Sequence, residues 1–349
     1  MKHAIDQREP APVRAHDDGG ATLVVQTAFL GDVVLTIPLL NALAAQHGPV
    51  AVITTAAAAP LLEAHPAVRA VIPFDKHGAD RGFRGLFRLA RDLRHDGYRR
   101  VYLPHRSWRT AALALAARIP ERIGFADSPA AVTYTRRVPR QQSLHETRRL
   151  LALAPGEPPV VFDFGLTPMD RTRAQAWLQT HGVRAPFIAM APGSAWGTKR
   201  WPGYAELARQ LGCTVVVLGG PGERELAAAI VATCSDRCVS AAGDTTLRES
   251  AAILERAQLL VTNDSAPLHV AGAVGTPVVA VFGPTVPAFG FGPQGSEDVI
   301  VERRGLACRP CSPHGPETCP LGHHRCMNDI DVATVLRAVE RVRAAVETD

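Results

Sequence analysis

The sequence predicts an α/β protein with two halves, each a parallel β-sheet wound by helices on both faces. Apolar, β-rich runs alternate with helical patterns along most of the chain, as in βαβ units. A stretch rich in proline and glycine, residues 154–168, separates two such series. We therefore expect a boundary near residue 165 and a binding cleft between the halves, because ligands of open α/β sheets lie beyond the carboxyl ends of the strands.

The expected strands are β-rich apolar runs on both sides of this linker. They comprise residues 22–25, 50–54, 68–74 and 100–103 in the first half, and 187–191, 214–218, 259–262 and 278–282 in the second. The chain is expected to consist of a flexible N-terminal tail (1–20), a first doubly wound α/β domain (21–165), a second such domain (166–330) and a C-terminal helix (331–349).

Length and composition are those of a globular protein. The chain has 349 residues, of which 46% are hydrophobic and 20% charged, and this length suffices for two cores of ordinary size. No apolar run approaches the roughly 20 residues that span a bilayer, and residues 1–20 lack the apolar core of a signal peptide. We expect a cytoplasmic protein, in which seven cysteines favour thiols or a metal site over disulfides.

Positive charge is concentrated in the first half of the chain. Residues 69–149 contain 18 Lys and Arg against 7 Asp and Glu, a balance of about +11, whereas the whole chain carries +5. Such a region indicates an anionic partner, either nucleic acid or a phosphorylated glycolipid at a membrane surface. Solvated arginine-rich helix faces would explain the same excess, particularly at Arg84, Arg88, Arg91 and Arg94.

Asp32 lies in the first turn of an apolar helix, directly after a strand and a turn at Gly31, and faces the expected cleft. This carboxylate has two candidate roles. It can cap the helix by accepting backbone N–H bonds, or it can take a proton from a substrate hydroxyl as a general base, a role worth roughly 10²–10⁴-fold in rate. The turn has no Gly-x-Gly-x-x-Gly pattern, which argues against a dinucleotide site.

A loop with two adjacent cations follows the first strand of the second half. It is rich in Gly, Ser and Thr, and its polar residues are Ser194, Thr198, Lys199 and Arg200. Lys199 could neutralise a leaving diphosphate, with Ser194 and Thr198 adding hydrogen bonds. Alternatively, the two cations are solvated loop residues.

Glu223 lies in the next loop between a strand and a helix. Its carboxylate could accept both hydroxyls of a ribose, or it could sit favourably in the first helical turn. The sequence leaves both roles open.

Residues 261–284 are the most informative segment of the chain. An apolar run, a polar turn, a short apolar helix, a Gly275-Thr276-Pro277 break and a second β-rich run indicate a compact βαβ unit. The unit aims a helix N-terminus at the carboxyl edge of a parallel sheet, where free N–H groups and the helix dipole favour an anion. The first functional expectation is a ligand with phosphate groups.

A Pro/Gly-rich loop near the C-terminus contains four cysteines within a span of 19 residues: Cys308, Cys311, Cys319 and Cys326. Four thiols in such a loop could bind zinc or iron tetrahedrally as a structural site. Their spacing departs from paired Cys-x2-Cys knuckles. Free thiols or a disulfide are the alternatives, and no catalytic role is expected.

Taken in order, these blocks resemble one family of glycosyltransferases. The blocks are the Gly31-Asp32 turn, the loop from Pro192-Gly193-Ser194 to Lys199-Arg200-Trp201-Pro202, and Asn263-Asp264-Ser265 through His269 to Gly275-Thr276-Pro277. Over about residues 22–346 the chain is similar to the ADP-heptose:lipopolysaccharide heptosyltransferases of glycosyltransferase family 9. Segments 285–291 and 319–327 look most like the type II enzymes, which add the second heptose of the inner core.

The resemblance implies a GT-B fold, in which two Rossmann-like domains face a central cleft, and an inverting transfer from ADP-heptose within that cleft. Asp32 would deprotonate the acceptor hydroxyl, while Lys199 and Ser194 would hold the donor diphosphate. Such a displacement requires no metal or other cofactor, because the departing charge is met by Lys199 and backbone donors.

Further donor contacts are implied on the second half. Glu223 would lie near the adenosine ribose, and Asp264, Ser265, Ala266 and the helix they begin would contact phosphate and sugar. Because Asp264 would repel a diphosphate, we expect its side chain to cap the helix or bind sugar hydroxyls while backbone N–H groups meet the phosphate. His269, one turn into that helix, is expected to be a buried hydrogen-bonding residue.

The implied acceptor is lipid A carrying Kdo and the first heptose, at the cytoplasmic face of the inner membrane, where the enzyme would be peripheral. Its phosphates would be received by the basic region, with Arg81, Arg84, Arg106, Arg109, Arg136 and Arg137 as candidates. Another GT-B enzyme, such as a protein O-heptosyltransferase, would keep the donor loops. A nucleic-acid-binding protein would leave Asp32 unexplained, and 5% aromatic residues offer few stacking platforms, so nucleic acid is not an expected partner.

Overall fold

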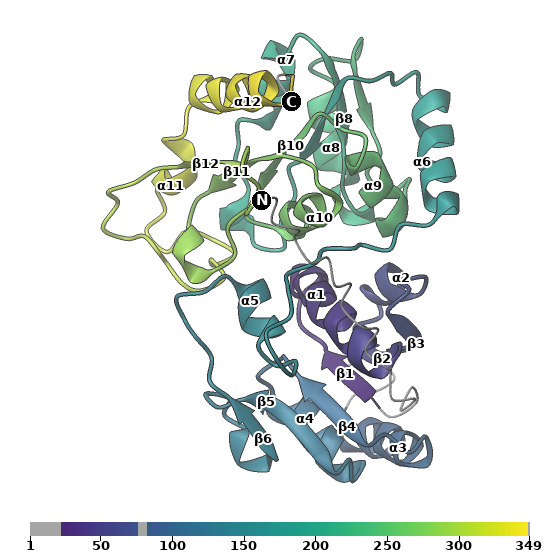
Figure 1. Cartoon of the computed structure of the whole chain (residues 1–349). Coiled ribbons are helices and arrows are strands. Elements are labelled where there is room, and N and C mark those ends of the chain that lie inside the picture. The colour runs from purple at the N-terminus through teal and green to yellow at the C-terminus, as the bar shows by residue number, and fades with distance from the viewer. Residues whose placement is uncertain (1–21, 76–81, 348–349) are drawn as a thin grey trace, which may run out of the picture.

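The computed structural model describes residues 22–75 and 82–347 and arranges them as two parallel six-stranded sheets with helices around them (Figure 1). The predicted tail, residues 1–20, and the candidate Arg81 lie outside the described residues. The strands of the first sheet come from residues 22–138 and those of the second from residues 187–302. The boundary that we propose near residue 165 falls between them, in a segment without helix or strand.

The first sheet has the strand order β3-β2-β1-β4-β5-β6, with every neighbouring pair parallel. Its strands are β1 (Thr22–Gln26), β2 (Val50–Thr54), β3 (Val68–Pro73), β4 (Arg100–Leu103), β5 (Glu121–Phe125) and β6 (Arg136–Val138). The helices of this half are α1 (Leu30–His47), α2 (Ala59–Leu62), α3 (Gly82–His95), α4 (Trp108–Ala116) and α5 (Glu146–Leu151), with a 3₁₀ turn η1 (Ala131–Thr133).

The second sheet has the order β12-β11-β10-β7-β8-β9 and is also parallel throughout. Its strands are β7 (Phe187–Ala191), β8 (Thr214–Val217), β9 (Cys238–Ser240), β10 (Leu259–Asn263), β11 (Val278–Phe282) and β12 (Val299–Glu302). The helices are α6 (Pro168–Thr180), α7 (Tyr204–Gln210), α8 (Arg224–Val231), α9 (Leu247–Leu254), α10 (Ala266–Val274), α11 (Arg325–Asn328) and α12 (Val332–Val346), with 3₁₀ turns η2 (Gly197–Lys199), η3 (Pro221–Glu223) and η4 (Pro287–Phe289).

Both sheets share one topology. Counted from the N-terminus within each sheet, the strand order is 3-2-1-4-5-6 in both, so the order reverses between β1 and β4 and again between β7 and β10. Doubly wound sheets bind ligands outside the carboxyl ends of the strands at this reversal. Asp32 lies in the first turn of α1, which follows β1, and Ser194 and Asp264 lie in the loops after β7 and β10. The topology therefore brings these three residues to the two crevices.

Every expected strand is present, and the structure adds β5, β6, β9 and β12. Three of these, β6, β9 and β12, are edge strands, and β6 and β9 have only 3 residues each. Two arginines stand in β6, and β5 begins with Glu121-Arg122. Short edge strands do not need a continuous apolar run, which explains why the pattern did not reveal β6 and β9.

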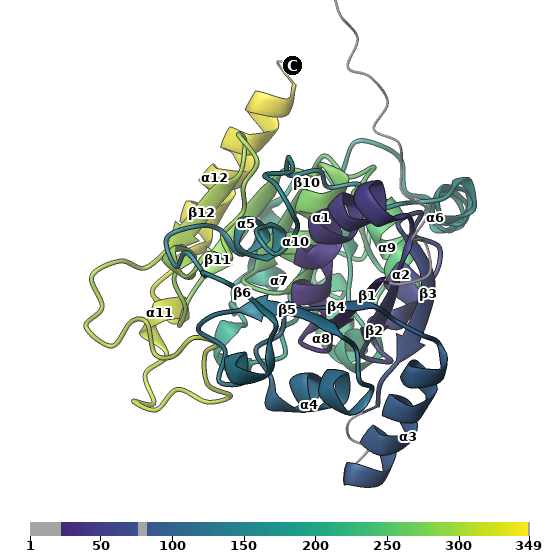
Figure 2. The same ribbon diagram turned by 60° about the horizontal axis from the view of Figure 1, so that its bottom comes forward.

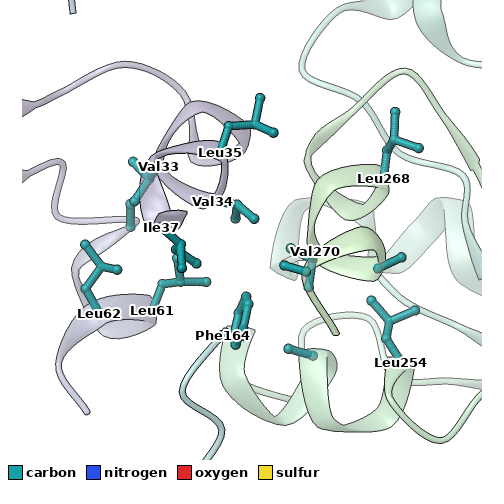
Figure 3. Packing of buried hydrophobic residues seen from close by; sticks show 14 of the residues in the cluster. Val33, Val34, Leu35, Ile37, Leu61, Leu62, Phe164, Leu254, Leu268 and Val270 are labelled. Atoms are coloured by element: carbon teal, nitrogen blue, oxygen red, sulfur yellow. The ribbon is translucent and has the colours of Figure 1, made fainter. Parts of the chain in front are cut away.

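The apolar core continues from one half of the molecule into the other (Figure 3). Val33, Val34 and Leu35 of α1 belong to the same buried cluster as Leu268 and Val270 of α10. Helix α1 contacts β1 and β2 on one side and α10 on the other, so residues 33–40 are all buried. This position explains why α1 is apolar on every face rather than along a single stripe.

A buried arginine also connects the halves. Arg248 of α9 donates from Nη1 to the Leu61 carbonyl at 2.8 Å and forms an ion pair with Asp170 at 2.7 Å. Its Nη2 also donates to the Gly165 carbonyl at 2.5 Å. One side chain of the second half thus satisfies backbone groups of α2 and of the connecting segment, which fixes how the two sheets face each other.

The last helix, α12, packs on the second sheet through Val335, Val339 and Val342. It begins at Asp331, whose Oδ1 accepts the Thr334 amide at 2.6 Å, so the Asp329-Ile330-Asp331 sequence serves as a helix cap. Neither α12 nor any other helix in the described part of the chain combines the length and apolarity needed to cross a membrane.

Candidate active site between the two sheets

A cavity of about 500 Å³ lies between the halves, at the carboxyl ends of both sheets. The first half contributes the turn from Phe29 to Asp32. The second half contributes the loops after β7, β8 and β10 and the segment around η4, including Gly193, Ser194, Lys199, Glu223, Asp264, Ser265, Ala266, His269, Val286 and Phe289. The volume is in the range of sites that hold a small molecule.

Asp32 performs the capping role and lines the cavity at once. It is the third residue of α1, and its Oδ2 accepts the Phe29 amide at 3.2 Å. Burial raises the pKa of Asp32 to about 6, and the negative charge of Glu146 adds to this effect. A carboxyl group with this pKa is well matched to take up a proton near neutral pH, so the cap does not exclude the general-base role.

Glu146 belongs to a buried charge cluster that the sequence did not reveal. Its Oε2 accepts Arg140 Nη2 at 2.5 Å and Arg149 Nη1 at 3.0 Å, and both the glutamate and Arg149 are buried. Arg149 also donates to the Phe289 carbonyl at 3.0 Å, and the Glu146 amide donates to the Gly290 carbonyl at 2.8 Å. The cluster therefore ties α5 of the first half to the cavity wall of the second.

Lys199 and Asp264 form an ion pair inside the cavity wall. Lys199 Nζ lies 2.6 Å from Asp264 Oδ2, which also accepts the Thr285 hydroxyl at 2.6 Å. Side-chain exposure is 11% for Lys199 and 9% for Asp264, so the alternative of a solvated lysine is wrong. A lysine in the site uses one N–H on this carboxylate and keeps two for a ligand.

The prediction that Asp264 caps α10 is wrong, because the Asp264 carboxylate pairs with Lys199 instead. The N-cap of α10 is Ser265, and its side chain makes no capping hydrogen bond. The physical reason is that the ammonium group of Lys199 is a stronger partner for a buried carboxylate than a backbone N–H. Pro267 has no N–H group and the Leu268 amide donates to the Ser265 carbonyl at 3.1 Å. Among the described residues, the amides that remain open at the N-terminus of α10 are therefore those of Ser265 and Ala266, and both residues border the cavity.

The two hydroxyl residues of the cationic loop differ in position. Ser194 lines the cavity, and its Oγ accepts the Trp196 amide at 3.3 Å. Thr198 is buried, is not among the lining residues, and donates its hydroxyl to the Pro316 carbonyl. In this conformation only Ser194 is placed to meet a ligand, and a donor contact by Thr198 stays a prediction.

Glu223 lines the cavity at the start of α8. Its Oε2 accepts the Gly220 amide at 2.7 Å, so the carboxylate organises its own loop. A Cβ atom on Gly193 would lie only 1.5 Å from Glu223 Oε1, which shows that the two loops meet because Gly193 has no side chain. Both roles expected for Glu223 remain compatible with this position.

His269 lies on the side of α10 that faces α1. A Cβ atom on Gly31 would stand 2.9 Å from its Cδ2, and the ring also borders a second cavity of about 500 Å³. Burial lowers the pKa of His269 to about 4, so the ring is neutral at pH 7. Within the described ranges, neither ring nitrogen of His269 forms a hydrogen bond, so the hydrogen bond that we expected for this residue is not present there.

Three aromatic rings at the cavity were not anticipated from the sequence. Phe29 lies 6.3 Å from Trp196 and 6.1 Å from His314, centroid to centroid, and Trp196 stacks with His314 at 6.5 Å. They come from three distant segments, so no local pattern could have grouped them. All three line the cavity.

The candidate arginines do not converge on this cavity. Arg106 pairs with Asp127 at 3.6 Å, the guanidinium of Arg109 lies 5.0 Å from the Phe74 ring centroid, and Arg136 donates to the Leu153 carbonyl. Arg84 on α3 and Arg137 on β6 are exposed. None of these five is a lining residue, and their contact with an acceptor stays a prediction.

The cysteines depart in part from expectation. Cys234 and Cys238 form a disulfide, against the preference for thiols, because helix and strand ends bring their Cα atoms to 5.5 Å. Thiols of Cys308, Cys311, Cys319 and Cys326 are free. In the described ranges no three His, Cys, Asp or Glu residues are grouped to hold a metal ion, and structural zinc or iron at the four thiols stays a prediction.

A model described as glycosyltransferase family 9 (heptosyltransferase) matches residues 86–322 of this sequence. The chain belongs to glycosyltransferase family 9. Lipopolysaccharide heptosyltransferase 2 of Escherichia coli strain K12 is 31% identical over 301 residues, which cover 76% of this chain and 84% of that protein.

Two solved structures have the same architecture. E. coli ADP-heptose lipopolysaccharide heptosyltransferase II matches with a TM-score of 0.76 and 25% identity, over 94% of this chain and 99% of that chain. A glycosyl transferase family 9 structure from Veillonella parvula matches with a TM-score of 0.80 and 25% identity, over 94% and 98% of the two chains. The family 9 member described here therefore has the GT-B fold, as predicted.

Membership of family 9 does not by itself identify the base. The matched region begins at residue 86, beyond Asp32. Asp32 lines the same cavity as Lys199 and the start of α10.

Proposed function

We propose that this family 9 glycosyltransferase moves a heptose from ADP-heptose to the first heptose of the lipopolysaccharide inner core. The observation that carries the proposal is the composition of the central cavity. A carboxyl group with a pKa of about 6 enters from one half, and a lysine and an open helix N-terminus enter from the other. The E. coli relative and the matching E. coli structure are both named for heptose transfer to lipopolysaccharide.

The proposed step is a single displacement that inverts the anomeric carbon. Asp32 takes the proton of the acceptor hydroxyl while that oxygen bonds to the anomeric carbon of heptose. The bond from this carbon to the diphosphate breaks, and its electron pair leaves with ADP. Lys199 and the amides at the start of α10 meet the developing negative charge, so the step requires no metal or other cofactor.

The donor is proposed to lie along the second half. Ser194 and Lys199 would bind the diphosphate, and Glu223 would accept the ribose hydroxyls, since all three border the same cavity. Ser265, Ala266 and His269 lie along the first turn of α10, where phosphate and sugar would pass. Asp264 would act chiefly by holding Lys199 in place, because its Oδ2 already has two partners.

The acceptor is proposed to be lipid A carrying Kdo and one heptose, reached at the cytoplasmic face of the inner membrane, with the enzyme peripheral there. Positive charge in the first half suits phosphates of such a lipid. Arg84, Arg106, Arg109, Arg136 and Arg137 are the candidates within the described residues.

The deciding experiment offers ADP-heptose with lipopolysaccharide acceptors truncated before and after the first heptose. We expect ADP release and a mass increase of one heptose only with the acceptor that already carries one. Transfer to the acceptor without heptose would instead assign the first addition. Transfer to neither, together with glycosylation of a protein hydroxyl, would replace this function by protein O-heptosylation.

A pH prediction follows from the charge next to Asp32. The base acts when deprotonated, so kcat/KM should fall as the pH drops through about 6, the pKa of Asp32. Replacing Glu146 with glutamine removes a negative charge that raises this pKa. The acidic limb of the pH profile should therefore move to lower pH, by up to about 1 unit.

Glu121→Gln is the matched control for this shift. It removes the same charge from an ion pair with Arg100, at 3.4 Å, outside the cavity. Its profile should coincide with that of the unmodified enzyme. An acidic limb that stays in place in Glu146→Gln would show that Glu146 does not act on the base.

A further inference from the structure

Helices α3 and α4 expose large apolar side chains that the core does not use. The exposed fraction is 81% for Phe83 and 61% for Phe87 on α3, and 54% for Trp108 and 50% for Leu115 on α4. We call these four residues and the outer faces of the two helices the α3/α4 surface. Several large apolar side chains on neighbouring helices mark an interaction site rather than scattered surface residues.

The buried face of α3 is complete without its two phenylalanines. Leu86, Ala90 and Leu93 point into the core of the first half together with residues of the sheet. Phe83 and Phe87 are four residues apart, so they form a ridge on the helix beside this buried face. The apolar ridge is therefore available to something outside the molecule.

Positive charge accompanies this ridge. Within α3 there are four arginines and one aspartate, and Arg84, Arg91 and Arg94 are exposed. One of these charges is partly balanced, because Arg91 pairs with Asp92 at 3.1 Å. Exposed phenylalanines beside exposed arginines are residue types that membrane-interface helices present to a bilayer.

The position of the surface suits a flat partner. Helices α3 and α4 pack against each other and against the face of the first sheet that carries Leu23, Val25 and Leu103. Helix α1 covers the opposite face and meets α10. Figures 1 and 2 show α3 and α4 at the end of the molecule remote from the second half, so no described element of the second half covers them.

We propose that the α3/α4 surface docks the protein on an anionic phospholipid bilayer, with the aromatic side chains at the level of the headgroups and the arginines on lipid phosphates. Tryptophan prefers the headgroup level, and phenylalanine and leucine side chains enter the boundary between headgroups and acyl chains. This inference deepens the proposed function. It rests on that function only in one respect, namely that a lipid acceptor explains why the enzyme binds a membrane. Docking would bring the enzyme to a membrane that holds a lipid acceptor without a spanning helix.

Vesicle binding by the full chain tests the docking surface directly. We expect the full chain to sediment with vesicles of phosphatidylglycerol and phosphatidylethanolamine. The fraction bound to vesicles of phosphatidylcholine alone should be lower by at least about ten-fold. Phe83→Ser with Phe87→Ser should reduce the bound fraction about ten-fold or more. Arg91→Gln with Arg94→Gln should weaken binding to anionic vesicles by roughly five-fold for each charge.

Matched controls come from the other half of the molecule. Met169→Ser with Leu321→Ser removes apolar side chains that are 59% and 61% exposed, and Arg173→Gln with Arg341→Gln removes exposed charges. Both pairs should bind vesicles as the unmodified chain does. Thermal unfolding of each variant verifies that the exposed substitutions leave the fold intact.

Three outcomes would overturn the proposal: no binding by the unmodified chain, unchanged binding by the phenylalanine variant, or equal binding to phosphatidylcholine. Concentration-dependent dimerisation that the phenylalanine substitutions abolish would assign the surface to a second copy of the chain instead. Transfer to a deacylated, water-soluble acceptor separates the two proposals. The phenylalanine variant should transfer heptose to this soluble acceptor at a rate within about two-fold of the unmodified chain. If the unmodified chain itself does not transfer heptose to this acceptor, the proposed function is contradicted but the docking proposal is not.

Discussion

Replacing Asp32 with asparagine should lower kcat by roughly 10²–10⁴-fold while leaving donor affinity within a few-fold of its original value. Asparagine has the same shape, and its amide oxygen can still accept the Phe29 amide that now bonds to Asp32 Oδ2 at 3.2 Å. What it cannot do is take the proton of the attacking hydroxyl. The measurements are ADP release in the presence of acceptor and calorimetric titration with ADP-heptose.

Glu249→Gln separates catalysis from capping. Glu249 holds the same third position in α9, where its Oε2 accepts the Thr246 amide at 2.8 Å, but it does not line the cavity. This variant should lose at most about 1 kcal/mol of stability and keep its activity. Turnover of Asp32→Asn close to that of the unmodified enzyme would remove Asp32 from the base role.

Replacing Lys199 with alanine should have two effects that can be measured apart. Asp264 would be left buried with only Thr285 as a partner, and breaking such a pair costs about 3–5 kcal/mol of unfolding free energy. The lost ammonium group should also weaken donor binding, because Lys199 lines the cavity. Chemical denaturation reports the first effect and titration with ADP-heptose the second.

A double variant, Lys199→Ala with Asp264→Asn, assigns these effects. Removing the orphaned carboxylate should restore most of the lost stability, since the uncompensated charge is then absent. Donor binding should remain weak, because the cation is still missing. Recovery of both properties in the double variant would mean that Lys199 serves the fold and not the diphosphate.

Local patterns revealed the parts of the fold that depend on neighbours in the sequence. The strands buried on both faces, such as β2 and β10, are continuous apolar runs and were predicted, whereas the edge strands β6 and β9 were not. Asp32 was found for a similar reason, since a carboxylate that follows a strand and turn stands out in an otherwise apolar segment.

Long-range contacts explain what the sequence did not show. One of the two roles expected for Asp264 was to cap its own helix, but its partner Lys199 lies 65 residues away. Glu146 influences Asp32 across more than a hundred residues of chain, and the strand before it, β6, is a short edge strand that the pattern did not reveal. Such pairings depend on how two elements meet in space, which periodicity and local composition do not encode.

The contact between Gly31 and His269 has a consequence for the geometry of the reaction. Asp32 is the next residue of α1, and His269 lies one turn along the helix whose first amides are proposed to hold the phosphate. A side chain on Gly31 would have to displace the imidazole or push the two helices apart. The missing methyl group of Gly31 thus sets how closely the proposed proton acceptor can approach the proposed phosphate site, and one absent carbon atom determines the width of the cleft at this point.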